Sequence, residues 1–218
     1  MIQKNNRREI LEAAYWLFYD QGYNATSLED VACRCGVTKQ AVSYHFGSKN
    51  GLGKEVAAMV STRVSRNFEV VARKYNPEAT SMEIGAAYLI WFSRAYRHDE
   101  KAFRFYREFI LLDENFSDLV DLVQSTYERD IRGDVSETMD SLWQMQMMSA
   151  FYAGKGLLYH YALGNLTCSE ELFAQYYFSN YYKSFYSEQE LKKLYIRGKE
   201  VVRNIGENDF TYQMALFM

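Results

Sequence analysis

The chain has 218 residues, a formal net charge of -3 and 48% hydrophobic residues, a composition typical of soluble globular proteins and not of disordered chains. Its single proline and low glycine count leave little turn chemistry for a β-sheet. Long stretches rich in Leu, Ala, Glu, Lys, Tyr and Met favour helices. We therefore expect an all-α fold of roughly ten helices.

The sequence argues against a membrane protein, a disulfide-bonded protein and a metalloprotein. It has no run of about 18 apolar residues, and the start MIQKNNRREI lacks the apolar core of a secretion signal, so we expect a cytoplasmic protein without a membrane partner. Cys33 and Cys35 stand two apart on an expected helix, where their side chains diverge, and Cys168 is remote. Neither the cysteines nor the histidines have the spacing of zinc ligands, so we expect no metal and no cofactor.

Charge is distributed unevenly along the chain. Residues 1–56 contain seven basic and six acidic residues, a net of +1, which leaves -4 for the rest. An anionic partner is therefore expected to meet the N-terminal part.

Two helices are expected first, over about residues 6–21 and from about residue 27. Apolar residues recur at helical spacing up to Phe18, and Gly22 follows as a left-handed stop. Thr26 and Glu29 stand in the order of a capping box, and Gly36 ends the second helix after barely two turns.

A third short helix follows the turn at Gly36, with Thr38 as its cap. Its residues Val42 and Phe46 are expected to face inward, whereas five residues with hydrogen-bonding ends face outward. These five are Lys39, Gln40, Ser43, Tyr44 and His45. Ser48 then caps a fourth helix that runs to about residue 74. Two short helices joined by a glycine-containing turn are typical of a helix-turn-helix, whose second helix reads the major groove of DNA.

The outer face of the third helix suits particular DNA groups. Lys39 can donate to guanine and Gln40 can pair with an adenine edge, while the other polar residues suit phosphate oxygens. Backbone amides near Thr26 and Ser27 are expected to form a second phosphate clamp. The complete set of expected DNA contacts is Thr26, Ser27, Thr38, Lys39, Gln40, Ser43, Tyr44, His45 and Lys49. The alternative is an ordinary three-helix corner with a solvated polar face.

Residues 7–56 contain the pattern RREILEAAYWLFYDQGYNATSLEDVACRCGVTKQAVSYHFGSKNGL, which resembles the DNA-binding domain of the TetR family of transcriptional regulators. The resemblance is carried by "IL-AA--LF---GY-ATS", by the turn "VA---GV" and by the closing "YHF-SK". The family usually places an aromatic residue where Ser43 stands, which shifts the expected phosphate or thymine contact to Tyr44. For the rest of the chain the resemblance implies a helical architecture and a dimer.

Beyond Pro77 the sequence predicts six further helices. Thr80 and Glu83 form a capping box for a helix to about His98, and Ser169 and Ser187 cap two later helices. The other three helices are expected over about 101–112, 116–132 and 135–164, and the two capped helices end near 185 and 204. Residues 206–218 form a tail with apolar ends that we expect to dock against the rest of the protein. We expect two domains: a DNA-binding domain over 1–56, and an effector-binding and dimerisation domain over 57–218.

Dimerisation is expected because one short recognition helix covers only half of an operator. The expected interface is formed by 143–164 and 170–185, where small residues let helices approach closely: Ala153, Gly154, Gly156, Ala162 and Gly164. Alternatively, these glycines pack helices within one chain.

Aromatic residues are concentrated after residue 56, where 29 of the 36 lie. They can line a cavity for a small hydrophobic or aromatic effector, or they simply fill a helical core. The expected pocket walls are Tyr88, Trp91, Phe105, Phe109, Trp143, Met148 and Tyr152.

The sequence contains no G-x-S-x-G, P-loop or dinucleotide motif, so we expect no enzyme. Our hypothesis is a dimeric one-component transcriptional regulator that binds a palindromic operator and is released by a small-molecule effector. Of the two kinds of regulator, we expect a repressor. The alternative is a helical small-molecule-binding or structural protein that no longer uses its DNA-reading head.

Overall fold

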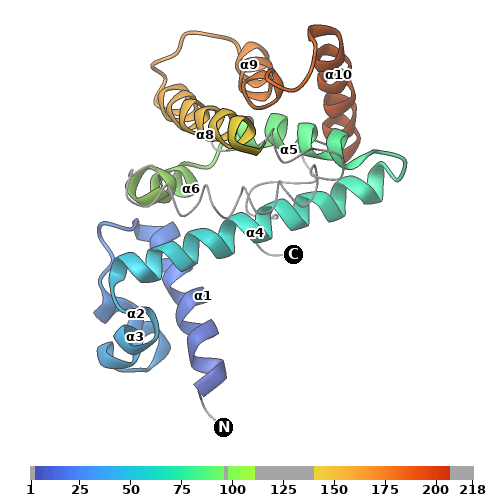
Figure 1. The fold of residues 1–218 in the computed structure, drawn as a ribbon. Coiled ribbons are helices and arrows are strands. Elements are labelled where there is room, and N and C mark those ends of the chain that lie inside the picture. The colour runs from blue at the N-terminus through green and yellow to red at the C-terminus, as the bar shows by residue number, and fades with distance from the viewer. Residues whose placement is uncertain (1–2, 96–97, 111–139, 207–218) are drawn as a thin grey trace. The chain divides into compact units, whose positions relative to one another are not determined.

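The structure is a computed structural model that describes residues 3–95, 98–110 and 140–206, with side chains over 7–95, 98–109 and 145–206. Within these ranges the chain is helical and has no β-strand, which confirms the expected all-α fold. It divides into two compact units: Met1–Thr62 with Glu100–Leu119, and Arg63–Asp99 with Val120–Met218. Helices α1 to α6 and α8 to α10 are labelled in Figure 1.

The first unit begins with α1 (Gln3–Gln21), α2 (Leu28–Cys35) and α3 (Lys39–Phe46). Helix α1 buries Ile10, Ala14 and Phe18, which stand on one helical face. It stops at Gly22, which has φ +96° and donates its N–H to the carbonyl of Phe18 at 3.1 Å. The stop signal predicted from the sequence is therefore confirmed.

The cap of α2 lies one residue later than the sequence indicated. Ser27, not Thr26, is the N-cap: the Asp30 N–H donates to Ser27 Oγ at 3.1 Å, and the Ser27 N–H donates to Asp30 Oδ2 at 2.7 Å. Thr26 is only 2% exposed, and its hydroxyl donates to the carbonyl of Gly22 at 2.7 Å. The predicted box of Thr26 and Glu29 is wrong because Thr26 completes the end of α1 instead.

The turn between α2 and α3 follows the sequence prediction. Gly36 adopts φ +65° and donates its N–H to the carbonyl of Cys33, and the N–H of Ala41 donates to Thr38 Oγ1 at 3.2 Å. Helix α4 (Lys49–Tyr75) begins after Ser48, whose hydroxyl accepts the N–H of Gly51 at 3.0 Å. The first part of α4 belongs to the first unit and the rest to the second.

The first unit also contains a segment from much later in the chain. This segment consists of α6 (Glu100–Phe105) and a π-helical turn, η1 (Tyr106–Ile110). Phe105 stacks on Phe18 with ring centroids 5.5 Å apart, and Phe109 contacts Tyr23 at 4.6 Å. A helix over 101–112 was predicted, but the π-helical turn and this packing against α1 were not.

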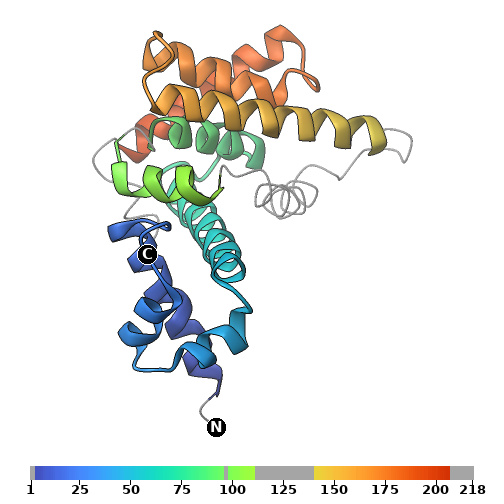
Figure 2. The same ribbon diagram turned by 90° about the vertical axis from the view of Figure 1, so that its left-hand side faces the viewer.

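The second unit is built from α5 (Ser81–Ala95), α8 (Asp140–Ala162), α9 (Glu170–Tyr182) and α10 (Glu188–Ile205), together with the end of α4. Helix α5 packs on α9 and α10, and α8 packs on α9, as both views show (Figure 1, Figure 2). The capping boxes predicted at Thr80 and Ser187 and the cap at Ser169 are all present. Helix α9 ends at Tyr182, slightly before the predicted residue 185.

Close packing between helices of the second unit depends on aromatic rings and small residues. Tyr161 of α8 stacks on Phe173 of α9, with centroids 3.6 Å apart. Gly198 of α10 lies where a Cβ atom would come within 3.1 Å of Ala86, Ala87 and Ile90 of α5. The predicted helix over 116–132, the start of the 135–164 segment and the tail lie outside the described residues. None of the helices that the structure does describe is both long and apolar enough to span a bilayer.

Candidate nucleic-acid interface

The outer face of α3 is polar and open to solvent. Lys39, Gln40 and Tyr44 are exposed, and the Tyr44 side chain reaches 80% exposure. On the opposite side Val42 is fully buried and Phe46 is 7% exposed. The two buried residues of α3 stand four positions apart, as the sequence pattern predicts, and the exposed polar residues lie on the other face. This arrangement presents hydrogen-bonding groups while fixing the helix from behind.

Ser43 and His45 flank this face and are partly buried. The His45 ring stands edge-on to the Tyr44 ring at 5.4 Å, which restricts the directions that the phenol can take. Behind the helix, the Arg7 guanidinium lies 5.1 Å from the centre of the Phe46 ring and also pairs with Glu55 of α4. Residues of α1 and α4 therefore support the end of α3.

Lys39, expected to contact a guanine, forms an ion pair with Glu29 of α2. The hydrogen bond from its ammonium group lowers the pKa of the Glu29 carboxyl. Both side chains are about half exposed, so the pair is open to competition by phosphate or water. Glu29 has no signal for this role in the sequence, where its position predicts only a capping partner of Thr26.

Lys49 is held beside the turn between α1 and α2. Its Nζ lies 4.4 Å from the centre of the Tyr23 ring and donates to the carbonyl of Asn24 at 3.3 Å. Partial burial lowers the pKa of Lys49, while the charges of Glu108 and Asp30 oppose this shift. Lys49, which the sequence predicts to contact phosphate, is therefore held in a defined position by Tyr23 and Asn24.

The amides of Thr26 and Ser27 have partners inside the protein. The Thr26 N–H donates to the carbonyl of Tyr23 at 3.2 Å, and the Ser27 N–H donates to Asp30 at 2.7 Å. The Thr26 side chain is buried, whereas Thr38 is exposed at the start of α3. A phosphate that bound the Ser27 amide would have to displace the Asp30 carboxylate, which is held by charge-assisted hydrogen bonds.

The residues expected to line an effector pocket do not all come together. Phe105 and Phe109 lie in the core of the first unit, with parallel rings 5.7 Å apart. Tyr88 and Trp91 lie in the second unit, 6.0 Å apart, and both rings contact Phe68. Two further candidates are exposed on α8, Met148 and Tyr152, and the side chain of Trp143 lies outside the described residues.

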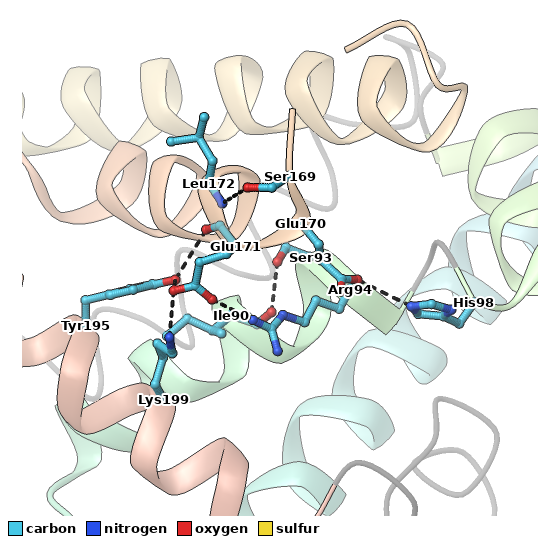
Figure 3. A network of polar contacts seen from close by, with 10 residues as sticks. All are labelled: Ile90, Ser93, Arg94, His98, Ser169, Glu170, Glu171, Leu172, Tyr195 and Lys199. Carbon is cyan, nitrogen blue, oxygen red and sulfur yellow. Dashed lines mark hydrogen bonds and ion pairs between the residues drawn. The ribbon is translucent and has the colours of Figure 1, made fainter. Parts of the chain in front are cut away.

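A polar cluster in the second unit was not foreseen (Figure 3). The carboxylate of Glu171 at the start of α9 accepts hydrogen bonds from Arg94 of α5 at 3.2 Å, and from Tyr195 and Lys199 of α10 at 3.0 and 2.6 Å. Burial, reinforced by the neighbouring carboxylate, raises the pKa of Tyr195. Glu171 was visible in the sequence only as an acid at a helix start, because its partners are distant along the chain.

Metal ligation has no support in the described part of the chain, where no three His, Cys, Asp or Glu side chains gather in a way that could hold an ion. The groups that the structure does gather around α3 are those that hydrogen-bond to phosphates and base edges.

Comparison with known proteins agrees with this arrangement. Residues 10–56 match a family model described as bacterial regulatory proteins of the tetR family. The "Probable HTH-type transcriptional regulator YttP" of Bacillus subtilis is 27% identical over 128 residues, which cover 58% of this chain and 59% of YttP. The chain thus spans well under two thirds of that relative's length.

Two solved structures share the fold. SmeT, described as the repressor of the Stenotrophomonas maltophilia multidrug efflux pump SmeDEF, has a TM-score of 0.52 at 19% identity, with 85% of this chain and 93% of SmeT covered. RolR, described in complex with the ligand resorcinol, has a TM-score of 0.57 at 14% identity, with 94% and 95% covered. At these identities the likeness concerns the fold alone.

Proposed function

The chain belongs to the TetR family of bacterial regulatory proteins, and from this premise we propose that it is a dimeric repressor that binds a palindromic operator and is released by a small-molecule effector. The observation that carries the proposal is the outer face of α3. Lys39, Gln40 and Tyr44 are exposed there while Val42 and Phe46 anchor the helix. A short helix that exposes polar groups on one face and buries the other enters the major groove of DNA while its buried face stays packed against the protein.

We assign base reading to Lys39 and Gln40, and phosphate contacts to Tyr44, His45, Ser43 and Lys49. Lys39 reaches guanine by leaving Glu29, an exposed pair that costs little to break. Thr38 contributes chiefly as the cap that fixes the start of α3. The amides near Thr26 and Ser27 contribute only if a phosphate displaces Asp30.

We propose that two copies pair through α8 and α9. Both helices carry large apolar side chains that are exposed in the single chain, and α8 leaves open space at Gly156. These side chains are Met145, Met148 and Tyr152 on α8, Leu163 directly after α8, and Leu172 and Tyr176 on α9. Pairing removes this apolar surface from water and places two recognition helices on one DNA face.

We propose further that the effector is a small hydrophobic or aromatic molecule bound within residues 57–218, near Tyr88 and Trp91. Both rings contact Phe68 of α4, the helix that continues into the DNA-reading unit. RolR, which shares the fold, binds the small phenol resorcinol. An effector that binds better to the form with mis-spaced recognition helices shifts the population toward that form.

A mobility-shift assay with DNA from upstream of the protein's own gene tests the proposal. We expect a retarded complex of two chains per duplex, with affinity that falls as salt rises and a preference over shuffled DNA. Small phenols, with resorcinol as the first probe, are expected to release it. Binding that is no tighter to the upstream duplex than to shuffled DNA would favour a helical protein that no longer uses its reading head.

A further inference from the structure

Glu108, which lies outside the 10–56 family match, contacts the turn that leads from α1 to α2. Its Oε2 accepts the N–H of Asn24 at 2.9 Å. The carboxylate fits over Gly22, where an added Cβ atom would lie 2.8 Å from Oε2. Because Gly22 also has φ +96°, a larger residue would strain the backbone and displace Glu108.

Neighbouring contacts hold Glu108 in place. The Arg104 guanidinium donates to the carbonyl of Asp20 at 2.9 Å, and Lys101 pairs with the Asp20 carboxylate at 2.8 Å. Phe109 is 1% exposed and packs on Tyr23. Its ring also fills the space that a side chain on Gly53 of α4 would need. The α6–η1 segment is thus attached to the end of α1 and to the following turn by several independent contacts.

Lys49 binds the same two residues of the turn that this segment supports. Tyr23 contacts Phe109 with its ring and also receives the Lys49 ammonium at 4.4 Å. Asn24 donates its N–H to Glu108 and accepts a hydrogen bond from Lys49 through its carbonyl. The position of Lys49 therefore depends on a turn whose own position depends on Glu108.

We infer that Glu108 is a positioning residue for DNA binding: it fixes the Tyr23–Asn24 turn, and through that turn it holds the Lys49 ammonium ready for a phosphate. This inference rests on the proposed function. The negative charge of Glu108 also favours the protonated form of Lys49, against the effect of partial burial. The DNA-reading head is then completed by a segment about fifty residues beyond the family match.

The sign of a mutational effect separates this role from that of an ordinary surface carboxylate. A carboxylate that merely lies near DNA repels phosphate, so its removal should tighten binding. If Glu108 positions Lys49, Glu108→Ala should weaken operator binding, because Lys49 must then be ordered during association. Ordering one such side chain corresponds to a change in Kd of about two- to twelvefold. Glu108→Gln keeps an acceptor for Asn24 and should stay within about twofold of the unaltered protein.

The experiment measures Kd for an operator duplex at several salt concentrations, below the melting temperature of every variant. Lys49→Met should reduce the salt slope by about one, whereas Glu108→Ala should raise Kd at every salt concentration with little change of slope, and the double variant should be no worse than Lys49→Met alone. Glu100→Ala removes the same charge from an exposed position at the start of α6 and serves as the matched control. It should not raise Kd.

The outcomes separate the two proposals. Weaker binding by Glu108→Ala, rescue by Glu108→Gln and non-additivity with Lys49→Met support the positioning role. Tighter or unchanged binding by Glu108→Ala overturns it, as does full additivity, while the unaltered protein's specific binding leaves the proposed function intact. Absence of specific binding by the unaltered protein overturns the proposed function itself.

Discussion

The hydroxyl group of Tyr181 on α9 occupies the space that a Cβ atom on Gly154 of α8 would need. Tyr181 is 7% exposed, its burial raises its pKa to about 12, and its hydroxyl lies 3.3 Å from that of Tyr177. Gly154 therefore allows close packing of α8 on α9 within one chain. We expect Gly154→Ala to lower the free energy of unfolding by about 1–3 kcal/mol through overpacking, measured by urea denaturation.

Gly156, two residues further along α8, provides the control. Nothing lies within 4 Å of a Cβ atom added there, so alanine should favour the helix by about 0.5–1 kcal/mol in the isolated chain. In the proposed dimer the same methyl group would meet the partner. Sedimentation at several concentrations should then show weaker association for Gly156→Ala. Unchanged association would place the interface away from this part of α8.

Replacement of Lys39 and Tyr44 together by alanine tests the reading face of α3. Because both side chains point to solvent, the helix content and the oligomeric state should not change. Operator affinity should fall by about tenfold or more, since one base contact is worth about 1–3 kcal/mol. A mobility-shift assay measures the operator affinity, and circular dichroism measures the helix content.

The exposed pair Lys74 and Tyr75 at the end of α4 supplies a matched control. It has the same residue types, with the Lys74 ammonium 5.1 Å from the centre of the Tyr75 ring. Its double alanine variant should bind the operator normally. Equal loss of affinity in both variants would show that the effect arises from net charge and not from the face of α3.

Local signals were predictable from the sequence, whereas contacts between distant segments were not. The helix stop at Gly22 and the caps at Thr38 and Ser187 depend on a few adjacent residues, and the structure contains them. Thr26 and Ser27 are both good caps, so only the buried hydrogen bond of Thr26 decides between them.

Long-range packing explains the rest of the difference. Phe105 and Phe109 are of the residue type that lines pockets. They pack instead on Phe18 of α1 and on Tyr23 of the following turn, because the chain returns to the first unit at Glu100. No periodicity in the sequence reports this return. For the same reason Glu108 and Glu171 had no recognisable signature. Asn24 lies 84 positions from Glu108, and the partners of Glu171 lie 24 to 77 positions away.

Glu171 is expected to make stability depend on pH. Hydrogen bonding from Lys199 is the largest cause that lowers its pKa from the usual 4.5, so the carboxylate stabilises the fold fully above about pH 4.5. This contribution is lost as pH falls through the lower pKa of the folded state. Glu171→Gln should therefore cost about 1 kcal/mol at pH 7, because the pairs are largely exposed, and the difference should shrink below pH 4.5.

Urea denaturation between pH 7 and pH 3.5 measures this difference. Glu188→Gln removes an acid from the first turn of α10 and controls for the helix dipole. Tyr195→Phe removes only the hydroxyl that donates to Glu171. Because this hydrogen bond also lowers the Glu171 pKa, the loss should be smaller but should likewise shrink below pH 4.5. A difference between Glu171→Gln and the unaltered protein that persists undiminished at pH 3.5 would contradict the role given to the carboxylate.

Glu29→Gln tests whether the ion pair with Lys39 opposes DNA binding. The carboxylate holds the Lys39 ammonium in the free protein, and the hydrogen bond between them lowers the pKa of the Glu29 carboxyl. Its removal frees Lys39 and also removes a repulsion from phosphate. Since an exposed ion pair is weak, Kd for the operator should fall only modestly, by less than about fivefold, at low salt. Glu9→Gln, an exposed acid on α1, should show only the smaller effect of net charge. If Glu29→Gln instead weakens operator binding while shuffled DNA is bound as before, Glu29 must orient Lys39 productively toward its base, and the pair belongs to the reading surface.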